Sequence, residues 1–269
     1  MRESAVLIES EANARFKRWK KLAAEPRAVR REGATLIEGI HLMQSALEAG
    51  WPVRAVMLDA EKAACEARAL AEEAAARCGA RLFLLPSALY RALSPVEHGA
   101  GAVAEIPVGR TDGWPEGDVL YLDGVQDAGN AGTLIRTAVA SGVRIVAASP
   151  TTASLWAPKV LRAGMGAHFG AAIIEGVTPE VLRARFRGLI AAADARGGED
   201  LFAAKDPWFR GRVAWILGAE GPGVSEAALA AADRRFYIPI EPACESLNVG
   251  AAAAVCLFEQ RRRRMAALS

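Results

Sequence analysis

The sequence has few cysteines, no long apolar run and almost no net charge. Its four cysteines, Cys65, Cys78, Cys244 and Cys256, show no CxxC spacing, so neither a zinc site nor a redox pair is indicated. No stretch reaches the roughly 18 apolar residues of a membrane-spanning helix. The apolar residues 5–8 are too few for a secretory signal. We therefore expect a cytoplasmic protein with free thiols, no metal site and no membrane partner.

The net charge of +2 would by itself argue against a strongly basic nucleic-acid binder. The charge is unevenly distributed, however. Residues 13–31 hold eight basic residues and one acidic residue, and Arg261–Arg264 add four positive charges. Clustered Lys and Arg displace counterions from nucleic acid, although a solvated helix face is the plain alternative. The candidate phosphate-binding side chains of the first cluster are Arg15, Lys17, Arg18, Lys20, Lys21, Arg30 and Arg31.

Short strands and helices alternate along the whole chain, which favours an α/β fold. The first series contains strands at 34–39, 53–58 and 81–85 and predicts a smaller domain over residues 1–106, with a helical segment at 13–31 broken near Pro26. The Gly- and Pro-rich residues 107–117 predict a linker. Residues 118–269 predict a second domain with a buried parallel sheet and a closing helix at 247–265.

Three polar, glycine-bearing segments follow strands of the second domain, at 122–137, 215–224 and 238–250. In parallel sheets, ligands bind outside the carboxyl ends of the strands. Each segment also has a plain structural reading. Asn130, Ser246 or Asn248 could cap a helix, Arg136 could form a surface ion pair, and 218–223 could be a helix-entry turn. The three segments in this order are more informative than any one of them.

Together the three segments resemble the SpoU (TrmH-like) family of RNA ribose 2′-O-methyltransferases, in the SPOUT class. The resemblance covers about residues 118–265. The matching residues of the three motifs are Asn130, Gly132 and Arg136; Leu217, Gly218, Glu220 and Gly223; and Ile238, Pro239, Ser246, Leu247, Asn248 and Val249. The N-terminal half is more loosely similar to the ribosomal-protein-like substrate-binding domain of rRNA-modifying members, through residues 36–39, the following helix and residues 94–99.

The resemblance implies an α/β trefoil-knot domain that transfers a methyl group from S-adenosyl-L-methionine to a ribose 2′-hydroxyl of RNA. It implies a homodimer, because the active site of the family is shared between two subunits. The implied cofactor contacts are Leu217, Gly218, Ile238, Ser246 and Leu247. The implied catalytic residues are Arg136, Asn130, Glu220, Ser246 and Asn248.

Arg136 matches the key residue proposed for the family. Because a guanidinium is normally protonated, Arg136 either holds the target phosphate or acts as a base after passing its proton to that phosphate. The sequence leaves both roles open.

The sequence departs from the family pattern in two places. Ile240, Glu241 and Pro242 stand where the family usually has Met-x-Gly, and Gly250 stands where it often has serine. Proline removes a backbone N–H group and restricts the loop. These departures concern the shape of the cofactor loop.

Three other functions remain open. A Rossmann-type dehydrogenase or methyltransferase would use the loop at 122–132, but its glycines do not fit GxGxxG. A non-catalytic RNA-binding protein would not need Arg136, Glu220, Ser246 and Asn248 together. Within the family, a tRNA methyltransferase is the alternative to an rRNA enzyme acting on 23S rRNA, and the separate N-terminal domain favours rRNA.

Overall fold

The computed structural model describes residues 5–94, 96, 99–205 and 207–267. The chain forms two compact units. The N-terminal unit comprises residues up to Val108 together with Trp156–Phe169, and the C-terminal unit comprises Gly109–Leu155 and Gly170–Ser269. Part of the 94–99 segment lies outside the described residues.

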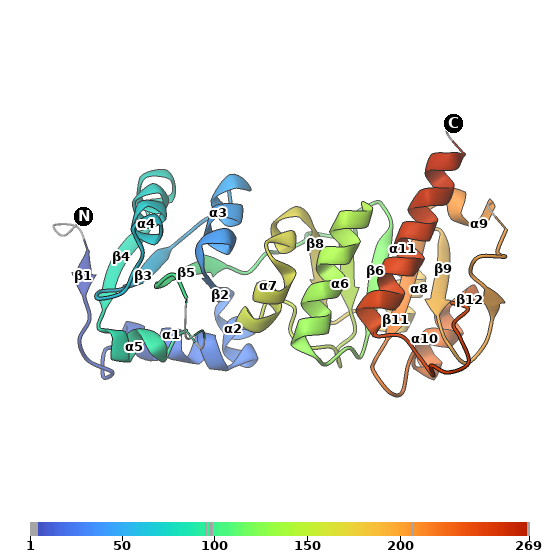
Figure 1. The fold of residues 1–269 in the computed structure, drawn as a ribbon, viewed down its shortest axis with the longest axis horizontal. Helices are drawn as coiled ribbons and strands as arrows, with labels where there is room; N and C mark the ends of the chain where they lie inside the picture. Colours follow the sequence, from blue (N-terminus) through green and yellow to red (C-terminus); the bar gives the residue numbers. More distant parts are fainter. Residues whose placement is uncertain (1–4, 95, 97–98, 206, 268–269) are drawn as a thin grey trace. The chain divides into compact units, whose positions relative to one another are not determined.

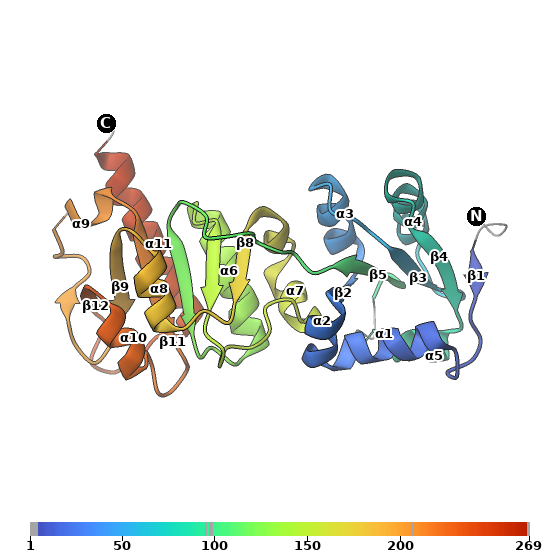
Figure 2. The ribbon, with the colours of Figure 1, turned by 180° about the vertical axis from the view of Figure 1, so that it is seen from behind.

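The N-terminal unit is built on a five-stranded sheet in the order β1-β4-β3-β5-β2. Its strands are β1 (Val6–Leu7), β2 (Ala34–Glu38), β3 (Ala55–Asp59), β4 (Arg81–Leu85) and β5 (Ala102–Pro107). β5 runs antiparallel to both of its neighbours, β3 and β2. The helices are α1 (Ala14–Ala24), α2 (Pro26–Glu32), α3 (Ile40–Glu48), α4 (Cys65–Cys78), α5 (Ser87–Arg91) and α7 (Pro158–Gly164). Helices α3 and α4 lie on one side of the sheet and α1 and α5 on the other (Figures 1 and 2).

The basic segment folds as two helices that meet at Pro26, as its sequence predicts. The Asn13 side chain accepts hydrogen bonds from the first N–H groups of α1, whose Phe16 and Trp19 side chains are buried. Pro26 begins α2, where its missing N–H group has no helical partner to lose. Gly33 ends α2 with a positive φ of 57°, a conformation that glycine adopts without strain.

The C-terminal unit contains a seven-stranded sheet in the order β10-β12-β9-β11-β6-β7-β8, with every strand pair parallel. Its strands are β6 (Val119–Asp123), β7 (Ile145–Ala148), β8 (Ala172–Glu175), β9 (Leu189–Ala193), β10 (Glu199–Asp200), β11 (Val213–Gly218) and β12 (Arg234–Tyr237). Its helices are α6 (Ala128–Ser141), α8 (Pro179–Arg185), α9 (Pro207–Arg210), α10 (Glu226–Ala231) and α11 (Val249–Ala266). The predicted α/β fold with a parallel sheet is confirmed.

Helices cover both faces of this sheet, which explains its continuous apolar strands. Helices α6 and α11 lie together on one face, and α8 and α10 on the other (Figures 1 and 2). Every residue of β11 is buried. Ile216 packs into the cluster formed with α8 and α10, whereas the Trp215 indole donates to Gln260 of α11 at 2.6 Å. Each fully buried large apolar side chain contributes roughly 1.5–3 kcal/mol.

The basic run at the end of α11, Arg261–Arg264, is bonded to the protein. Arg263 is 8% exposed and donates to three main-chain carbonyl oxygens of residues 201–204. Arg264 forms an ion pair with Asp118. Arg263 and Arg264 therefore fasten α11 to the residues after β10 and before β6, whereas Arg261 and Arg262 are exposed.

The observed elements differ from the sequence-based ones in two instructive places. Helix α6 begins at Ala128, within residues 122–132 that the sequence assigns to a loop, because Asp127 caps it by accepting from the Asn130 N–H group at 2.7 Å. β5 and α7 were not expected at all. The division into residues 1–106, 107–117 and 118–269 remains a prediction.

Candidate functional site

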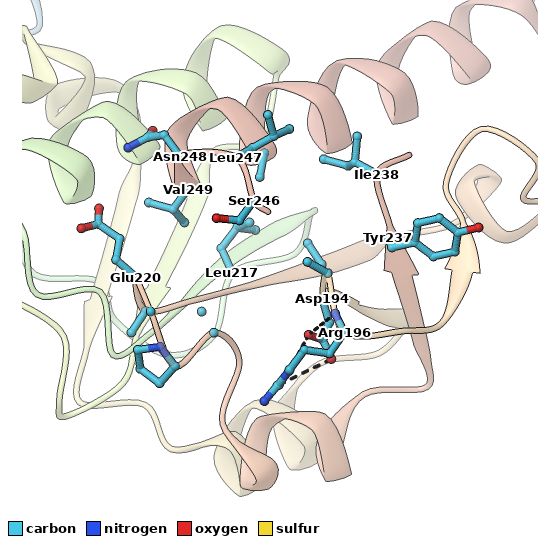
Figure 3. A pocket seen from close by; sticks show the side chains of 18 of the residues that line it. Asp194, Arg196, Leu217, Glu220, Tyr237, Ile238, Ser246, Leu247, Asn248 and Val249 are labelled. Atoms are coloured by element: carbon cyan, nitrogen blue, oxygen red, sulfur yellow. Dashed lines mark hydrogen bonds and ion pairs between the residues drawn. The ribbon is translucent and has the colours of Figure 1, made fainter. Parts of the chain in front are cut away.

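A cavity of about 560 Å³ opens at the carboxyl ends of β9, β11 and β12. The three segments selected from the sequence all contribute to its wall, although up to about 118 residues separate them along the chain. Figure 3 shows the side chains around the cavity. The predicted residues that line it are Asn130, Leu217, Gly218, Glu220, Ile238, Ser246, Leu247 and Asn248.

The turn after β11 closes one side of the cavity. The Ala219 N–H donates to the Gly223 carbonyl at 3.1 Å, and the Gly223 N–H donates back to Ala219 at 2.9 Å. Glu220 stands in the tip of this turn. A Cβ atom at Gly218 would lie 2.1 Å from the main chain of Gly223, so only glycine fits there. Gly218 is thus required by the close approach of the turn to the strand end.

The amide side chains of Asn130 and Asn248 join α6 to α11. Asn248 accepts from the first N–H groups of α11 and so caps the helix, as its sequence position allowed. Its Nδ2 donates to Asn130 Oδ1 at 3.1 Å. Asn130 itself is not the cap of α6, because Asp127 takes that role. Its amide is therefore free to hold Asn248 at the cavity wall.

The two departures from the family pattern lie in the loop between β12 and α11 and in the first turn of α11. The Cys244 N–H donates to the Glu241 carbonyl at 3.0 Å, which closes a turn with Pro242 at its second position, where proline is favoured. A Cβ atom at Gly250 would lie 3.0 Å from Thr133 Cγ2. Gly250 thus allows the first turn of α11 to pack closely on α6.

A buried carboxylate and two guanidinium groups lie at the end of β9. Asp194 has a side chain only 2% exposed and pairs with Arg196 at 2.9 Å and with Arg235. Burial favours a raised pKa for Asp194, but hydrogen bonds from Arg196 and Arg235 outweigh it and lower the pKa below its ordinary value. The carboxylates of Glu220 and Glu245 also line the cavity, so its wall carries negative charge beyond the balanced Asp194–Arg196 pair.

Arg136 is the predicted catalytic residue that the structure does not place in the cavity wall. Its side chain is exposed on the middle of α6. Among the described residues, no hydrogen-bond or ion-pair partner is found for it. The plain reading as an intramolecular surface ion pair therefore has no support.

The predicted phosphate-binding residues of α1 and α2 divide into two groups. The Arg18 guanidinium, 35% exposed, pairs with Glu32 and with the buried Glu105 at 2.8 Å. Its hydrogen bond to Glu105 is the main reason that its pKa is raised. The others are exposed: Arg15, Lys17, Lys20, Lys21, Arg30 and Arg31. Lys20 approaches the exposed Glu11 at 3.3 Å.

Sequence reasoning did not find Asp194, Arg196, Tyr237 and Glu245 in the cavity wall. For Asp194 a signal was present, because it directly follows the apolar residues 189–193. Nothing in a single sequence pairs it with Arg196 and Arg235. In the described part of the chain, no three His, Cys, Asp or Glu side chains are placed to hold a metal ion, and no helix is long and apolar enough to cross a membrane.

Comparison with known proteins gives matches over nearly the whole chain. The model of the SpoU rRNA Methylase family matches residues 118–258, and the model of the MRM3-like substrate binding domain matches residues 13–104. The 23S rRNA (guanosine(2553)-2′-O)-methyltransferase RlmP of Bacillus subtilis (strain 168) is 30% identical over 259 residues, which cover 94% of this chain and 98% of that protein.

Two further comparisons agree. The 23S rRNA (uridine(2479)-2′-O)-methyltransferase of Streptomyces viridochromogenes is 28% identical over 270 residues, covering 94% of this chain and 91% of that protein. The crystal structure of the SpoU methyltransferase AviRb from Streptomyces viridochromogenes, in complex with AdoMet, superposes with a TM-score of 0.83 at 25% identity, covering 94% of this chain and 98% of that one. The resemblance inferred from the three motifs is confirmed. The chain belongs to the SpoU rRNA methylase family.

Proposed function

We propose that this protein transfers a methyl group from S-adenosylmethionine to a ribose 2′-hydroxyl of 23S rRNA. The observation that carries the proposal is the meeting of all three motif segments around one cavity. The full-length relatives named as 23S rRNA 2′-O-methyltransferases support the substrate. These relatives modify different nucleosides, a guanosine and a uridine, so the target nucleotide of this chain is not inferred from them.

The cavity suits S-adenosylmethionine in size and chemistry. Its volume of about 560 Å³ lies within the roughly 300–1,000 Å³ of small-molecule sites. Leu217, Ile238 and Leu247 offer apolar walls, and Gly218 leaves main-chain atoms open to a ligand. Glu220 and Glu245 supply negative charge opposite a cationic sulfonium group. When bound, S-adenosylmethionine supplies an electrophilic methyl group.

The remaining task of the protein is to orient and activate a weakly nucleophilic hydroxyl. Correct orientation alone lowers the barrier by up to about 7–11 kcal/mol. In our proposal the Asn130–Asn248 pair and Glu220 position the ribose, while Ser246 lies beside both cofactor and substrate. Arg136 binds the target phosphate or, after proton transfer to that phosphate, accepts the hydroxyl proton. Asn248 is well suited to its part because it is already fixed as the α11 cap.

We further propose a homodimer that brings Arg136 of one subunit to the cavity of its partner. The support lies on the outer surface of α11, where Phe258 is 45% and Met265 is 60% exposed. Leu247, at the cavity, is 38% exposed. Exposed large apolar side chains suit an interface. Phe258→Asp should yield monomers in analytical ultracentrifugation, and an unchanged sedimentation coefficient would argue against this surface.

Three other features stay in the proposal. The loop before α11 forms the deep trefoil knot of the family, a rare exception to unknotted topology. Residues 1–106 form the RNA-binding domain, joined at 107–117 to a methyltransferase domain at 118–269. The protein acts in the cytoplasm without a metal ion. The alternative substrate is tRNA, and the match of residues 13–104 to a substrate-binding domain model favours rRNA.

The decisive assay offers labelled S-adenosylmethionine with either 23S rRNA or tRNA, both from a strain that lacks the modification. We expect label in 23S rRNA, and nuclease mapping then gives the nucleotide. Label in tRNA alone would select the alternative substrate. Binding of RNA without any binding of S-adenosylmethionine in calorimetry would instead identify a non-catalytic RNA-binding protein.

Arg136→Ala should abolish methyl transfer while leaving S-adenosylmethionine affinity unchanged, because Arg136 lies outside the cavity wall. Arg185→Ala is the matched control, since Arg185 is also exposed but ends α8 on the other face of the sheet. Single-turnover rates and calorimetry check both variants. Near-normal transfer by Arg136→Ala would remove this residue from the mechanism.

A further inference from the structure

Arg196 lines the cavity but belongs to none of the three motifs. It lies two residues beyond Asp194, in the loop that leaves β9. Its side chain is 48% exposed, in contrast to the 2% of Asp194. It is therefore placed between a buried carboxylate and the open cavity (Figure 3).

The guanidinium of Arg196 joins two segments that form the cavity. Its Nε donates to Asp194 Oδ1 at 2.9 Å. Its Nη2 donates to the carbonyl oxygen of Val224 at 2.7 Å. The planar guanidinium presents its donors in a fixed fork, so two of its nitrogens make these bonds at once. The side chain thus connects the end of β9 to the exit of the turn after β11.

Asp194, the residue to which Arg196 is bonded, is itself held firmly in place. Its N–H donates to the Phe236 carbonyl at 2.9 Å, and its carboxylate also accepts from Arg235 of β12. The main chain is equally constrained nearby, because a Cβ atom at Gly198 would lie 2.3 Å from the carbonyl oxygen of Arg235. The Asp194 carboxylate therefore cannot follow Arg196 if the turn moves.

The turn held by Arg196 is the one that carries Glu220. Its exit is anchored at two points: Arg196 binds the Val224 carbonyl, and the Ser225 N–H donates to Asp123 at 2.7 Å. Of these two anchors, only Arg196 also lines the cavity. A Cβ atom at Gly223 would lie 3.9 Å from the guanidinium, so Arg196 also lies against the turn itself.

We propose that Arg196 is a positioning residue that holds the Glu220 turn at the distance from β9 that methyl transfer requires. The inference rests on the proposed function, because it assigns Arg196 an effect on that reaction through Glu220. It requires no contact between Arg196 and the cofactor.

The first experiment follows amide hydrogen exchange of residues 219–224 in the full-length protein without RNA. In Arg196→Met, which keeps the length of the side chain but no donor, the amides of Ala219 and Gly223 should exchange about tenfold faster or more, the size of one charge-assisted hydrogen bond. Arg234→Met is the matched control, because Arg234 is 45% exposed and ion-paired with Glu199 at 3.0 Å. Its exchange in the turn should equal that of the wild type.

The second experiment measures single-turnover methylation of 23S rRNA and calorimetric affinity for S-adenosylmethionine. For Arg196→Met the rate should fall about 10- to 100-fold, while the dissociation constant stays within about threefold. Arg196→Lys keeps the charge but makes only one of the two bonds. Its methylation rate should therefore lie between that of the wild type and that of Arg196→Met. This variant also serves if Arg196→Met does not fold. An inactive wild type would contradict the proposed function and leave the exchange experiment intact.

Two outcomes overturn the positioning role. One is wild-type exchange and wild-type rate in Arg196→Met. The other is a rise in the dissociation constant that matches the loss of rate, which would mean that Arg196 contacts the cofactor directly.

Discussion

Cys256 differs chemically from the other three cysteines although all four are free thiols. It is fully buried in α11, and burial raises the pKa of its thiol to about 12. Since the thiolate is the reactive form, Cys256 should resist alkylation at pH 8. Cys65, Cys78 and Cys244 are exposed and should react quickly in the native protein.

Mass spectrometry after brief iodoacetamide treatment checks this prediction. Three labels are expected under native conditions and a fourth only in denaturant. Rapid native labelling of Cys256 would mean that α11 opens far more readily than its burial indicates.

Single residues show what a sequence can and cannot reveal about the site. Asn130, Glu220 and Asn248 were found because their spacing within a strand–turn–helix segment is local. Asp194 and Arg196 were missed, since their importance comes from Arg235 and Val224, which are distant in the sequence and close only after folding. Arg136 was found by its motif, and the structure places it on the exposed side of α6, outside the cavity wall.

At the scale of elements, α1 separates a structural face from a basic face. Phe16, Trp19 and Leu22 are buried, and Trp19 Nε1 donates to Glu105 at 2.8 Å, beside the Arg18 pair. Lys17, Lys20 and Lys21 are exposed. The sequence predicted one basic helical segment at 13–31. The spacing of its apolar residues and its charge do not show that Arg18 is held by Glu105 of β5.

Replacement of Lys17, Lys20 and Lys21 by Gln should weaken RNA binding and reduce the slope of log K against log salt by about two to three. The melting temperature and the affinity for S-adenosylmethionine should not change. Arg18→Gln should instead cost about 1–3 kcal/mol of stability, because it leaves the buried Glu105 short of donors. Filter binding across a salt series and thermal unfolding test both. An unaltered slope in the triple variant would mean that this face of α1 is a solvated helix surface that does not bind RNA.

Strand β5 and helix α7 show why elements were missed. β5 (Ala102–Pro107) merges into the Gly- and Pro-rich stretch that predicts a linker, so its apolar run had no clear boundary. Helix α7 (Pro158–Gly164) is only seven residues long, too short for periodicity to reveal. The long α11 and the apolar strands of the parallel sheet were predicted, because a long helical segment and short apolar runs can be recognised without the rest of the fold.

At the scale of the whole molecule, the chain visits the N-terminal unit twice. Residues 156–169 lie between β7 and β8 in sequence but pack in the N-terminal unit. The Thr35 hydroxyl donates to the Trp156 carbonyl at 2.7 Å, with both residues buried. The Trp156 ring stacks on Trp51 at a centroid distance of 5.7 Å. The linker predicted at 107–117 is therefore not the sole covalent connection between the units.

A fragment ending at Val108 should consequently be less stable than the same fragment with residues 156–169 fused to its end. In the shorter fragment Trp156 is absent, so the surfaces of Trp51 and β2 that it covers become exposed. Burial of such a large side chain contributes roughly 1.5–3 kcal/mol or more. Urea unfolding followed by tryptophan fluorescence compares the two fragments. Equal midpoints would show that the 156–169 segment adds nothing to this unit.

Because the N-terminal unit is built from two separate segments of the chain, it cannot be completed until the second segment has been synthesised. The ribosome releases the N-terminal strands first, but the segment that completes this unit follows about 60 residues later. At roughly 5–20 residues per second, the unit waits several seconds with an open flank. Even then α11, the last helix of the other unit, has not been made. This half-finished interval is when the nascent chain most needs a chaperone, and synonymous codons that slow translation between residues 109 and 155 should lengthen it.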